Sequence, residues 1–365
     1  MKADKMHLIL TVLFLVGLSW QMDAQVQNAD VYEFPDLKQK KLLNYRYHIN
    51  IPDIDGFETL KCDFHMHTDF SDGYVWPTMR VIEAWNDGLD AIAITDHIET
   101  KNRKNRDILE IDLNKSGEIA LKKGNEIGIL VIRGAEITRN KPLGHINALF
   151  VQDVTKMDVP DEIDAVSAAV EQGAYLVLNH PGWPNDTSTL YSVHKELIKQ
   201  NKIRGVEVFN GSESYPVALD WCNEYKLAFF ANSDLHYASA NSYREKLERP
   251  MTLVFVKERT VEGIKEALFA GRTVAYFCNN LAGEEKYLKE IIQKSLSVKV
   301  IDIDKSIIEV WNNSDIPFEI RFGDYMYSIP IFANQVLRIN LLSGTEVTFT
   351  NCMTGQNEYV KMKIW

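Results

Sequence analysis

The 365-residue chain has little cysteine: four are present, and no two of them form a C-x-x-C pair. A zinc site built from thiolates is therefore unsupported. Lysine and arginine are too few to balance the acids, so that the net charge is −11 and the sequence pI is about 5.4. Proteins that bind extended nucleic acid gain most of their affinity by neutralising phosphates with basic patches. The acidic balance therefore argues against extended nucleic acid as a partner, but it allows a small phosphorylated substrate.

Long apolar runs are absent except near the N-terminus, where Leu8 to Leu18 is mostly apolar and follows Lys2 and Lys5. Ala24 then offers a small residue for cleavage. A positive start, a short apolar run and a small residue form the layout of a secretory signal, and the run is too short to span a bilayer comfortably. We expect residues 1–24 to be a signal peptide and the chain to be exported to the periplasm or the extracellular space. No stable membrane insertion is expected after cleavage; a retained anchor is the alternative.

Short apolar runs rich in valine and isoleucine alternate with helical spacing from about residue 60 to residue 278. Helices are predicted at Pro77 to Asp87, Asp161 to Gln172 and Thr260 to Ala270. Each begins at a residue suited to a first turn or a cap, and the last two stop before a glycine. Repeated strand–helix alternation predicts an α/β fold with a largely parallel sheet, and a barrel is the natural closure at this length.

The segments on either side of this pattern differ from it. Residues 25–59 are polar and are predicted to form an N-terminal arm that leads into a barrel over residues 60–280. Glu284 to Lys294 has the spacing of a short helix. Residues 295–365 alternate between apolar and polar positions and are punctuated by turn residues, which predicts a small all-β domain resembling a sandwich.

Six of the nine histidines stand at or just past the end of an apolar run, usually beside an acid, a glycine or a proline. His7, His48 and His194 do not, and we treat them as bystanders. At the C-terminal ends of barrel strands, side chains that are distant in sequence converge on one active-site face. Three acids follow the same pattern. The candidate metal ligands are therefore His65, His67, Asp72, His97, Glu136, His145, His180, Asp234 and His236.

Two pairs among these candidates have i, i+2 spacing: His65 with His67, and Asp234 with His236. Side chains two residues apart in an extended chain point the same way, so that each pair can hold one ion. A single histidine at a strand end is more often a structural, hydrogen-bonded residue. The coincidence of six histidines and three acids at successive strand ends favours a metal cluster over that structural alternative.

The motifs around these residues resemble the PHP family, named for its polymerase and histidinol phosphatase members. They are HMHTDFSDG (65–73), ITDH (94–97), RGAEIT (133–138), GHINALF (144–150), NHPGW (179–183) and NSDLH (232–236). The resemblance covers about residues 60–278 and implies a distorted (β/α)7 barrel with two or three divalent ions, which are zinc, manganese or iron. The leader, the stretch ITRNKPLGHINALF (137–150) and the C-terminal β segment are similar to a secreted bacterial branch related to organophosphate phosphodiesterases.

Carried over position by position, this resemblance implies three metal sites. They would be held by His65, His67, Glu136 and Asp234; by Glu136, His145 and His180; and by Asp72, His97 and His236. Glu136 would bridge two ions and Asp234 would help to position a bridging hydroxide, so that both are candidate catalytic residues. The expected reaction is hydrolysis of a small phosphate monoester or diester by in-line attack of that hydroxide.

Substrate contacts are predicted less directly. Arg103, Arg106 and Arg139 follow ligand-bearing segments and could clamp phosphate, with solvated loop charges as the alternative. Glu207 is a candidate acceptor for a ligand histidine, or a partner for an arginine. Three aromatic side chains could either wall a leaving-group pocket or pack in the core: Trp76, Trp183 and Tyr237. Two other functions stay open, namely metal-dependent hydrolysis of an amide or lactone, and non-catalytic glycan binding by a metal-stabilised protein.

Overall fold

The computed structural model describes residues 45–99, 112–243, 249–323 and 326–365. The predicted signal peptide, most of the predicted arm, Arg103 and Arg106 lie outside these residues. Within the described ranges, no helix is both long enough and apolar enough to cross a bilayer.

Strands and helices alternate up to residue 283, and mostly strands follow. The first elements are β1 (Glu58–Asp63), α3 (Pro77–Asn86), β2 (Ala91–Ile94), α4 (Lys115–Ile127), β3 (Leu130–Thr138), β4 (His145–Leu149), η2 (Val154–Met157), α5 (Glu162–Glu171), β5 (Tyr175–Leu178), α6 (Ser192–Lys199), β6 (Ile203–Asn210), β7 (Glu213–Ser214), α7 (Pro216–Tyr225), β8 (Ala228–Asn232), α8 (Ser239–Ser242), β9 (Met251–Val256), α9 (Val261–Phe269), β10 (Thr273–Phe277) and β11 (Asn280–Gly283). The later elements are α10 (Glu285–Ser295), β12 (Leu296–Asp302), β13 (Ile307–Asn312), β14 (Phe318–Arg321), β15 (Ile329–Ile331), β16 (Val336–Asn340), β17 (Glu346–Gly355) and β18 (Glu358–Lys363).

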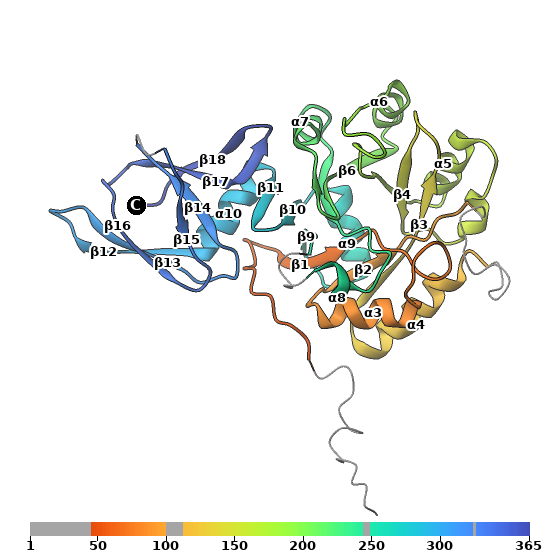
Figure 1. Cartoon of the computed structure of the whole chain (residues 1–365), viewed down its shortest axis with the longest axis horizontal. Helices are drawn as coiled ribbons and strands as arrows, with labels where there is room; N and C mark the ends of the chain where they lie inside the picture. The colour runs from red at the N-terminus through yellow and green to blue at the C-terminus, as the bar shows by residue number, and fades with distance from the viewer. Residues whose placement is uncertain (1–44, 100–111, 244–248, 324–325) are drawn as a thin grey trace, which may run out of the picture. The chain divides into compact units, whose positions relative to one another are not determined.

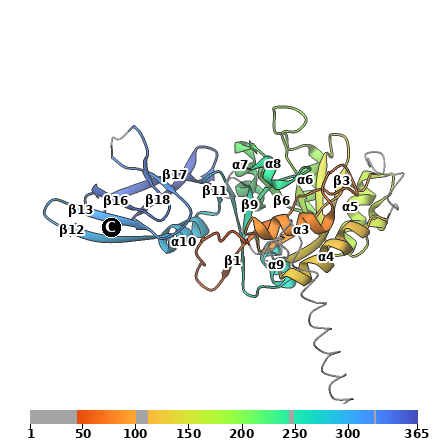
Figure 2. The same cartoon turned by 60° about the horizontal axis from the view of Figure 1, so that its bottom comes forward.

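The four predicted helices are confirmed as α3, α5, α9 and α10, and the start signals predicted for α3, α5 and α9 act as expected. The Asp161 carboxylate accepts hydrogen bonds from the first backbone amides of α5, and the Thr260 hydroxyl accepts one from Gly263 in α9. Helices α3 and α4 pack against each other and against β2, side by side in both views (Figure 1, Figure 2). Their buried faces supply Val81, Ala84 and Ala120 to the core.

One large sheet runs in the order β15-β14-β17-β11-β10-β9-β1-β2-β3-β4-β5-β6-β7, with β8 paired to β6 and β18 paired to β17. The prediction of a largely parallel sheet is only partly right. Strands β1, β2 and β3 are parallel, as are β5, β6 and β8, but β4 is antiparallel to both of its neighbours and β9 is antiparallel to β1. Only residues 139–144 connect β3 to β4, and a parallel crossover needs about a dozen residues or more.

The expected (β/α)7 barrel is not closed by backbone hydrogen bonds. Among the described residues, no backbone ladder joins β8 to β9 or β10. Threonine side chains bridge this seam instead. The Thr252 hydroxyl accepts a hydrogen bond from the Ala231 amide at 3.0 Å and donates one to the Ala231 carbonyl at 2.9 Å, and the Thr273 hydroxyl accepts one from the Phe229 amide at 3.1 Å.

The variant Thr252→Val tests this seam because valine keeps the shape of threonine and removes both hydrogen bonds. Thr252 is fully buried, so the backbone groups of Ala231 would lose partners without gaining water. We expect the free energy of unfolding in urea to fall by about 1–3 kcal/mol. Thr187→Val, at an exposed position, is the control and should change it little. Equal stability of Thr252→Val and the unchanged protein would show that the hydroxyl does not hold the seam.

The C-terminal strands form two sheets. Strands β12, β13 and β16 make a separate three-stranded sheet, whereas β14, β15, β17 and β18 continue the large sheet through the parallel pairing of β11 with β17 (Figure 1). One hydrophobic cluster includes Leu253 and Tyr276 together with Phe318 and Phe349. The C-terminal strands therefore share both a sheet and a core with the strands that precede them, and the predicted boundaries at 280 and 295 stay predictions.

Candidate metal centre

Two short backbone bridges align the segments that carry the candidate ligands. Met66 and Leu235 form a parallel bridge, flanked by hydrogen bonds from the Asp234 amide to the His65 carbonyl and from the His67 amide to the Leu235 carbonyl. The two i, i+2 pairs therefore lie side by side. A second parallel bridge joins His97 to Glu136. The strand ends thus bring together side chains from positions 65 to 236, as the sequence pattern indicates.

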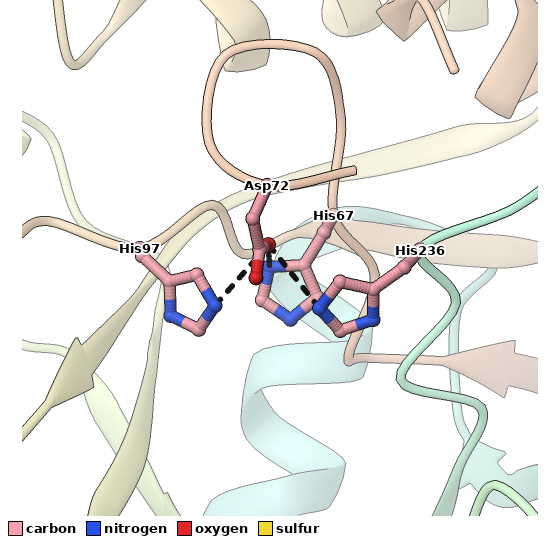
Figure 3. Close-up of side chains that lie close together, drawn as sticks. All are labelled: His67, Asp72, His97 and His236. Carbon is pink, nitrogen blue, oxygen red and sulfur yellow. Dashed lines mark ion pairs between the residues drawn. The ribbon is translucent and has the colours of Figure 1, made fainter. Parts of the chain in front are cut away.

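The first group of possible ligands is His67, Asp72, His97 and His236, whose ligand atoms all lie within 4.8 Å of one another. Asp72 is at its centre (Figure 3). Its Oδ1 lies 3.3 Å from His97 Nε2, 3.2 Å from His236 Nε2 and 3.9 Å from His67 Nδ1.

Two further groups overlap in sequence, the second sharing His67 with the first and the third sharing His65 with the second. They are His65, His67 and Asp234, and His65, Glu136 and His180. Asp234 Oδ1 lies 3.0 Å from His67 Nε2 and 3.3 Å from His65 Nε2. His145 is outside the three groups, although its Nδ1 lies 3.1 Å from Glu136 Oε1. All nine candidates therefore meet in one place, and the assignment of each to a particular ion stays a prediction.

Buried ring nitrogens that lack well-oriented hydrogen bonds indicate that these residues fit a cation. Among the described residues, His65 Nε2, both ring nitrogens of His67 and Asp234 Oδ1 are buried and make no well-oriented hydrogen bond. Burying such atoms without well-oriented hydrogen bonds is costly, and native proteins rarely do so without a reason. Imidazole nitrogens and carboxylate oxygens are the donors that zinc, manganese and iron accept. The donor set therefore fits divalent metal ions.

The charges at the centre also favour a bound cation. Burial alone would lower the pKa of His65, but the carboxylates facing its ring, led by Asp234, raise the pKa well above its ordinary value. His67 is the exception, because burial and His97 lower its pKa to about 4. A bound cation would neutralise the same carboxylates in place of imidazole protons. At His97, His180 and His236, as at His65, the nearby carboxylates outweigh burial and raise the pKa.

Glu207 contacts the ring of His65, the first histidine of the cluster, and this is one of the two roles predicted for it. Its fully buried carboxylate lies 2.9 Å from His65 Nδ1 and accepts a hydrogen bond from the His180 backbone amide at 2.8 Å. The amides of Asn210 and Asn232 donate to the same carboxylate. A carboxylate on Nδ1 fixes the ring so that Nε2 faces the cluster, which is how ligand histidines are usually oriented.

Two acids that sequence reasoning missed hold the ligand-bearing loops. Asp96 accepts hydrogen bonds from the Thr68 amide, the Thr68 hydroxyl and the Ser71 hydroxyl, and so fixes the loop that carries Asp72. Asp63 binds Ser233 and the buried Arg249. Both acids stand within two residues of a candidate histidine, and this closeness in sequence is the signal that could have identified them.

Two candidates have backbone torsions in the left-handed region, with φ of +21° at His180 and +52° at Asp234. Such torsions cost about 1–3 kcal/mol for residues other than glycine and persist where neighbouring contacts impose them. The His180 amide donates to Glu207, and the Asp234 amide donates to the His65 carbonyl. Strain at these positions is consistent with side chains that are placed for binding.

The fully buried Arg80 ties the two histidine pairs together. Its guanidinium donates to the carbonyl oxygens of His67 at 2.9 Å, Leu235 at 3.2 Å and Tyr237 at 2.9 Å, and pairs with Glu83. Arg80→Met would remove this donor from the His67 and Tyr237 carbonyls, whereas the Leu235 carbonyl would keep the His67 amide. We expect a loss of about 3–5 kcal/mol in the free energy of unfolding, measured in urea. The exposed Arg338→Met is the control, and a variant of Arg80 as stable as this control would contradict the assignment.

The cluster opens into a cavity of about 1130 Å³, whose wall includes Arg139, Trp183, Tyr191 and Tyr215. Trp183 is 52% exposed, and its ring centroid lies 4.8 Å from that of His145. Arg139 lies 3.2 Å from Glu99 and donates to the Val159 carbonyl at 2.7 Å, so that its charge is already engaged. Burial raises the pKa of Glu99 to about 7.

The other predicted aromatic wall residues lie elsewhere. Among the described residues, neither Trp76 nor Tyr237 lines this cavity. The Tyr237 ring stacks on that of Tyr74, and Trp76 lies against Phe70. His194, treated as a bystander, does line the cavity but is outside the three ligand groups.

Comparison with known proteins identifies the family. Residues 63–239 match the PHP domain. A crystal structure from Bacteroides vulgatus, described as a two-domain protein containing a predicted PHP-like metal-dependent phosphoesterase, is 34% identical, with a TM-score of 0.83 over 88% of this chain and 99% of that one. The chain belongs to the PHP family. Its structure is a mixed α/β, two-domain PHP-type fold with one large sheet.

More distant solved structures are similar over parts of the chain. A putative metal-dependent phosphoesterase from Bifidobacterium adolescentis is 18% identical, with a TM-score of 0.37 over 48% of this chain and 88% of that one. The lesion-specific endonuclease Q of Pyrococcus furiosus is 15% identical, with a TM-score of 0.42 over 62% of this chain and 59% of that one. No curated protein matches the chain.

Proposed function

We propose that this PHP protein hydrolyses small phosphate monoesters or diesters with the aid of two or three divalent metal ions. The observation that carries the proposal is the meeting of three overlapping ligand groups beside one cavity, whose wall several of the ligands form. The similar Bacteroides vulgatus protein, described as containing a metal-dependent phosphoesterase, supports the reaction class. The cavity exceeds what a phosphate group needs and is slightly larger than the range of about 300–1,000 Å³ that is usual for sites of organic ligands.

Different residues of the chain would have different roles in this reaction. Divalent cations held by the nine clustered side chains would supply Lewis acidity toward a phosphoryl oxygen and activate a water molecule. Glu136, fully buried between His97, His145 and Asn179, would keep the ligand groups at a fixed separation. Asp234 faces both His65 and His67 and would orient the attacking water. Trp183 would wall the space above His145 and His180 on the side open to the leaving group.

Rates on a panel of aryl esters test the proposal. The metal-loaded protein should hydrolyse phenyl phosphate or bis(4-nitrophenyl) phosphate, and removal of metal with a chelator should abolish this activity and re-addition should restore it. Aryl amides and lactones serve as the comparison substrates. Preference for an amide or lactone, or phosphate-ester turnover that is unchanged by complete metal removal, would contradict the proposal.

We also propose that the chain is exported, on the basis of Lys2, Lys5 and the apolar run Leu8 to Leu18. Expression of the full chain in a bacterial host, followed by fractionation and N-terminal sequencing, tests this. A mature chain that begins at Gln25 in the periplasm or medium is expected. Uncleaved protein in the cytoplasm would contradict it.

A further inference from the structure

The turn between β3 and β4 carries a lysine that the metal centre does not use. Apart from histidines, Arg139 and Lys141 are the only cationic residues among the described residues that line the cavity. Arg139 is engaged with Glu99 and Val159. The Nζ atom of Lys141 is buried and has no hydrogen-bond partner in the described part of the chain.

Hydrogen bonds hold this turn in place and so fix the position of Lys141. The Arg139 amide donates to the Gly144 carbonyl at 3.1 Å, and the Gly144 amide donates to the Asn140 carbonyl at 3.2 Å. His194 Nε2 donates to the Leu143 carbonyl at 2.7 Å, which fastens the turn to the start of α6. The Lys141 ammonium lies 5.9 Å from the centre of the Tyr191 ring, near the outer limit of a cation–π contact.

An ammonium nitrogen that is buried without an acceptor is costly, and a bound ligand is the natural source of that acceptor. Within the described residues, no hydrogen bond joins the Lys141 ammonium to the nine clustered side chains. The turn places Lys141 near Tyr191 and is bonded to His194, and both of these residues line the cavity and lie outside the three ligand groups. Two separate anion-binding features therefore face one cavity.

We propose that Lys141 binds a second anionic group of the substrate, so that the protein prefers phosphate esters whose organic part carries a carboxylate or a further phosphate. This inference rests on the proposed function for the identity of the first anion. The second anion would be held by Lys141, while the organic part between the two groups would occupy the space beside Tyr191 and Trp183.

Binding of phosphonates, which are not hydrolysed, tests this without turnover. Calorimetry on metal-loaded protein would compare phenylphosphonate with 4-carboxyphenylphosphonate, and propylphosphonate with 3-phosphonopropionate and propane-1,3-bisphosphonate. We expect at least one doubly anionic probe to bind about tenfold or more tightly than its singly anionic counterpart, because hydrogen bonds to charged groups are worth about 1.5–3 kcal/mol. The probe that gains shows whether a carboxylate or a phosphate is preferred.

Lys141→Met should abolish this advantage and leave the affinity for phenylphosphonate and propylphosphonate within about twofold, and Lys141→Arg should retain part of it. Lys122→Met, on the exposed face of α4, is the matched control and should behave as the unchanged protein. Equal weakening of all probes in Lys141→Met would place the lysine on the reacting phosphate and overturn the proposal. So would an unchanged advantage, or none in the unchanged protein. Phosphonate binding that depends on Lys141 in a protein that hydrolyses no phosphate ester would sustain the assignment of the second anion to Lys141 and reject the proposed function.

Discussion

His67→Ala should lower phosphate-ester hydrolysis by about 10³-fold or more, because metal ions contribute several kcal/mol to transition-state stabilisation and each 1.36 kcal/mol is a factor of ten. His67 belongs to two of the three ligand groups, and both of its ring nitrogens face carboxylates of the cluster. One substitution therefore removes a donor from two groups at once. Steady-state rates on phenyl phosphate, together with metal content per chain, would measure both consequences.

His48→Ala is the control, since His48 is exposed and outside the three groups. It should retain full activity and metal content. Circular dichroism and urea unfolding would show that His67→Ala remains folded, because the variant removes side-chain atoms that have no well-oriented hydrogen bond to lose. A folded His67→Ala protein with the rate of the control would contradict the assignment of His67 to the metal centre.

Glu207→Gln should weaken metal binding by about 10–100-fold, as substitution of residues that hold ligand histidines usually does. Four groups surround the Glu207 carboxylate: the His65 ring, the His180 amide and the side-chain amides of Asn210 and Asn232. A carboxylate only accepts hydrogen bonds, whereas one end of glutamine donates. One of the donors would then face another donor, and the His65 ring would lose the charge that fixes Nε2 toward the cluster.

Competition against a chromophoric chelator would measure the affinity for zinc and manganese in this variant. Glu213→Gln is the matched control, since Glu213 is an exposed carboxylate on the wall of the same cavity. It should change metal affinity by less than about twofold, because an exposed charge contributes little. Equal affinities of the two variants would show that Glu207 does not orient the ligands.

The sequence predicted much of the centre because strand ends are marked by local composition. The spacing of His65 with His67, and of Asp234 with His236, follows directly from the two-residue period of an extended chain, and the structure aligns these segments through the Met66–Leu235 bridge. The sequence did not show which of these residues would be shared between ligand groups. His67 joins the Asp72 group and His145 stands outside the three groups, because ring orientation depends on buried contacts that spacing does not encode.

The closure of the sheet was the least predictable part of the fold. Alternating strands and helices favoured a parallel barrel, but pairing direction depends on the length of each connection, and the short link before His145 reverses β4. The seam beside β8 is bridged by the hydroxyl of Thr252, a residue whose sequence context gives no sign of this role. Likewise, Arg80 lies within a predicted amphipathic helix, and its carbonyl contacts become visible only in three dimensions.

Whether the nine clustered side chains bind metal can be decided with a crystal of the protein loaded with zinc or manganese, measured at wavelengths on either side of the metal absorption edge. We expect two or three anomalous peaks at roughly 2.0–2.2 Å from nitrogen and oxygen ligands. The peaks should be enclosed by His65, His67, Asp72, His97, Glu136, His145, His180, Asp234 and His236. Protein loaded with metal in solution that shows no peak among these side chains, or a peak only at the molecular surface, would contradict this assignment.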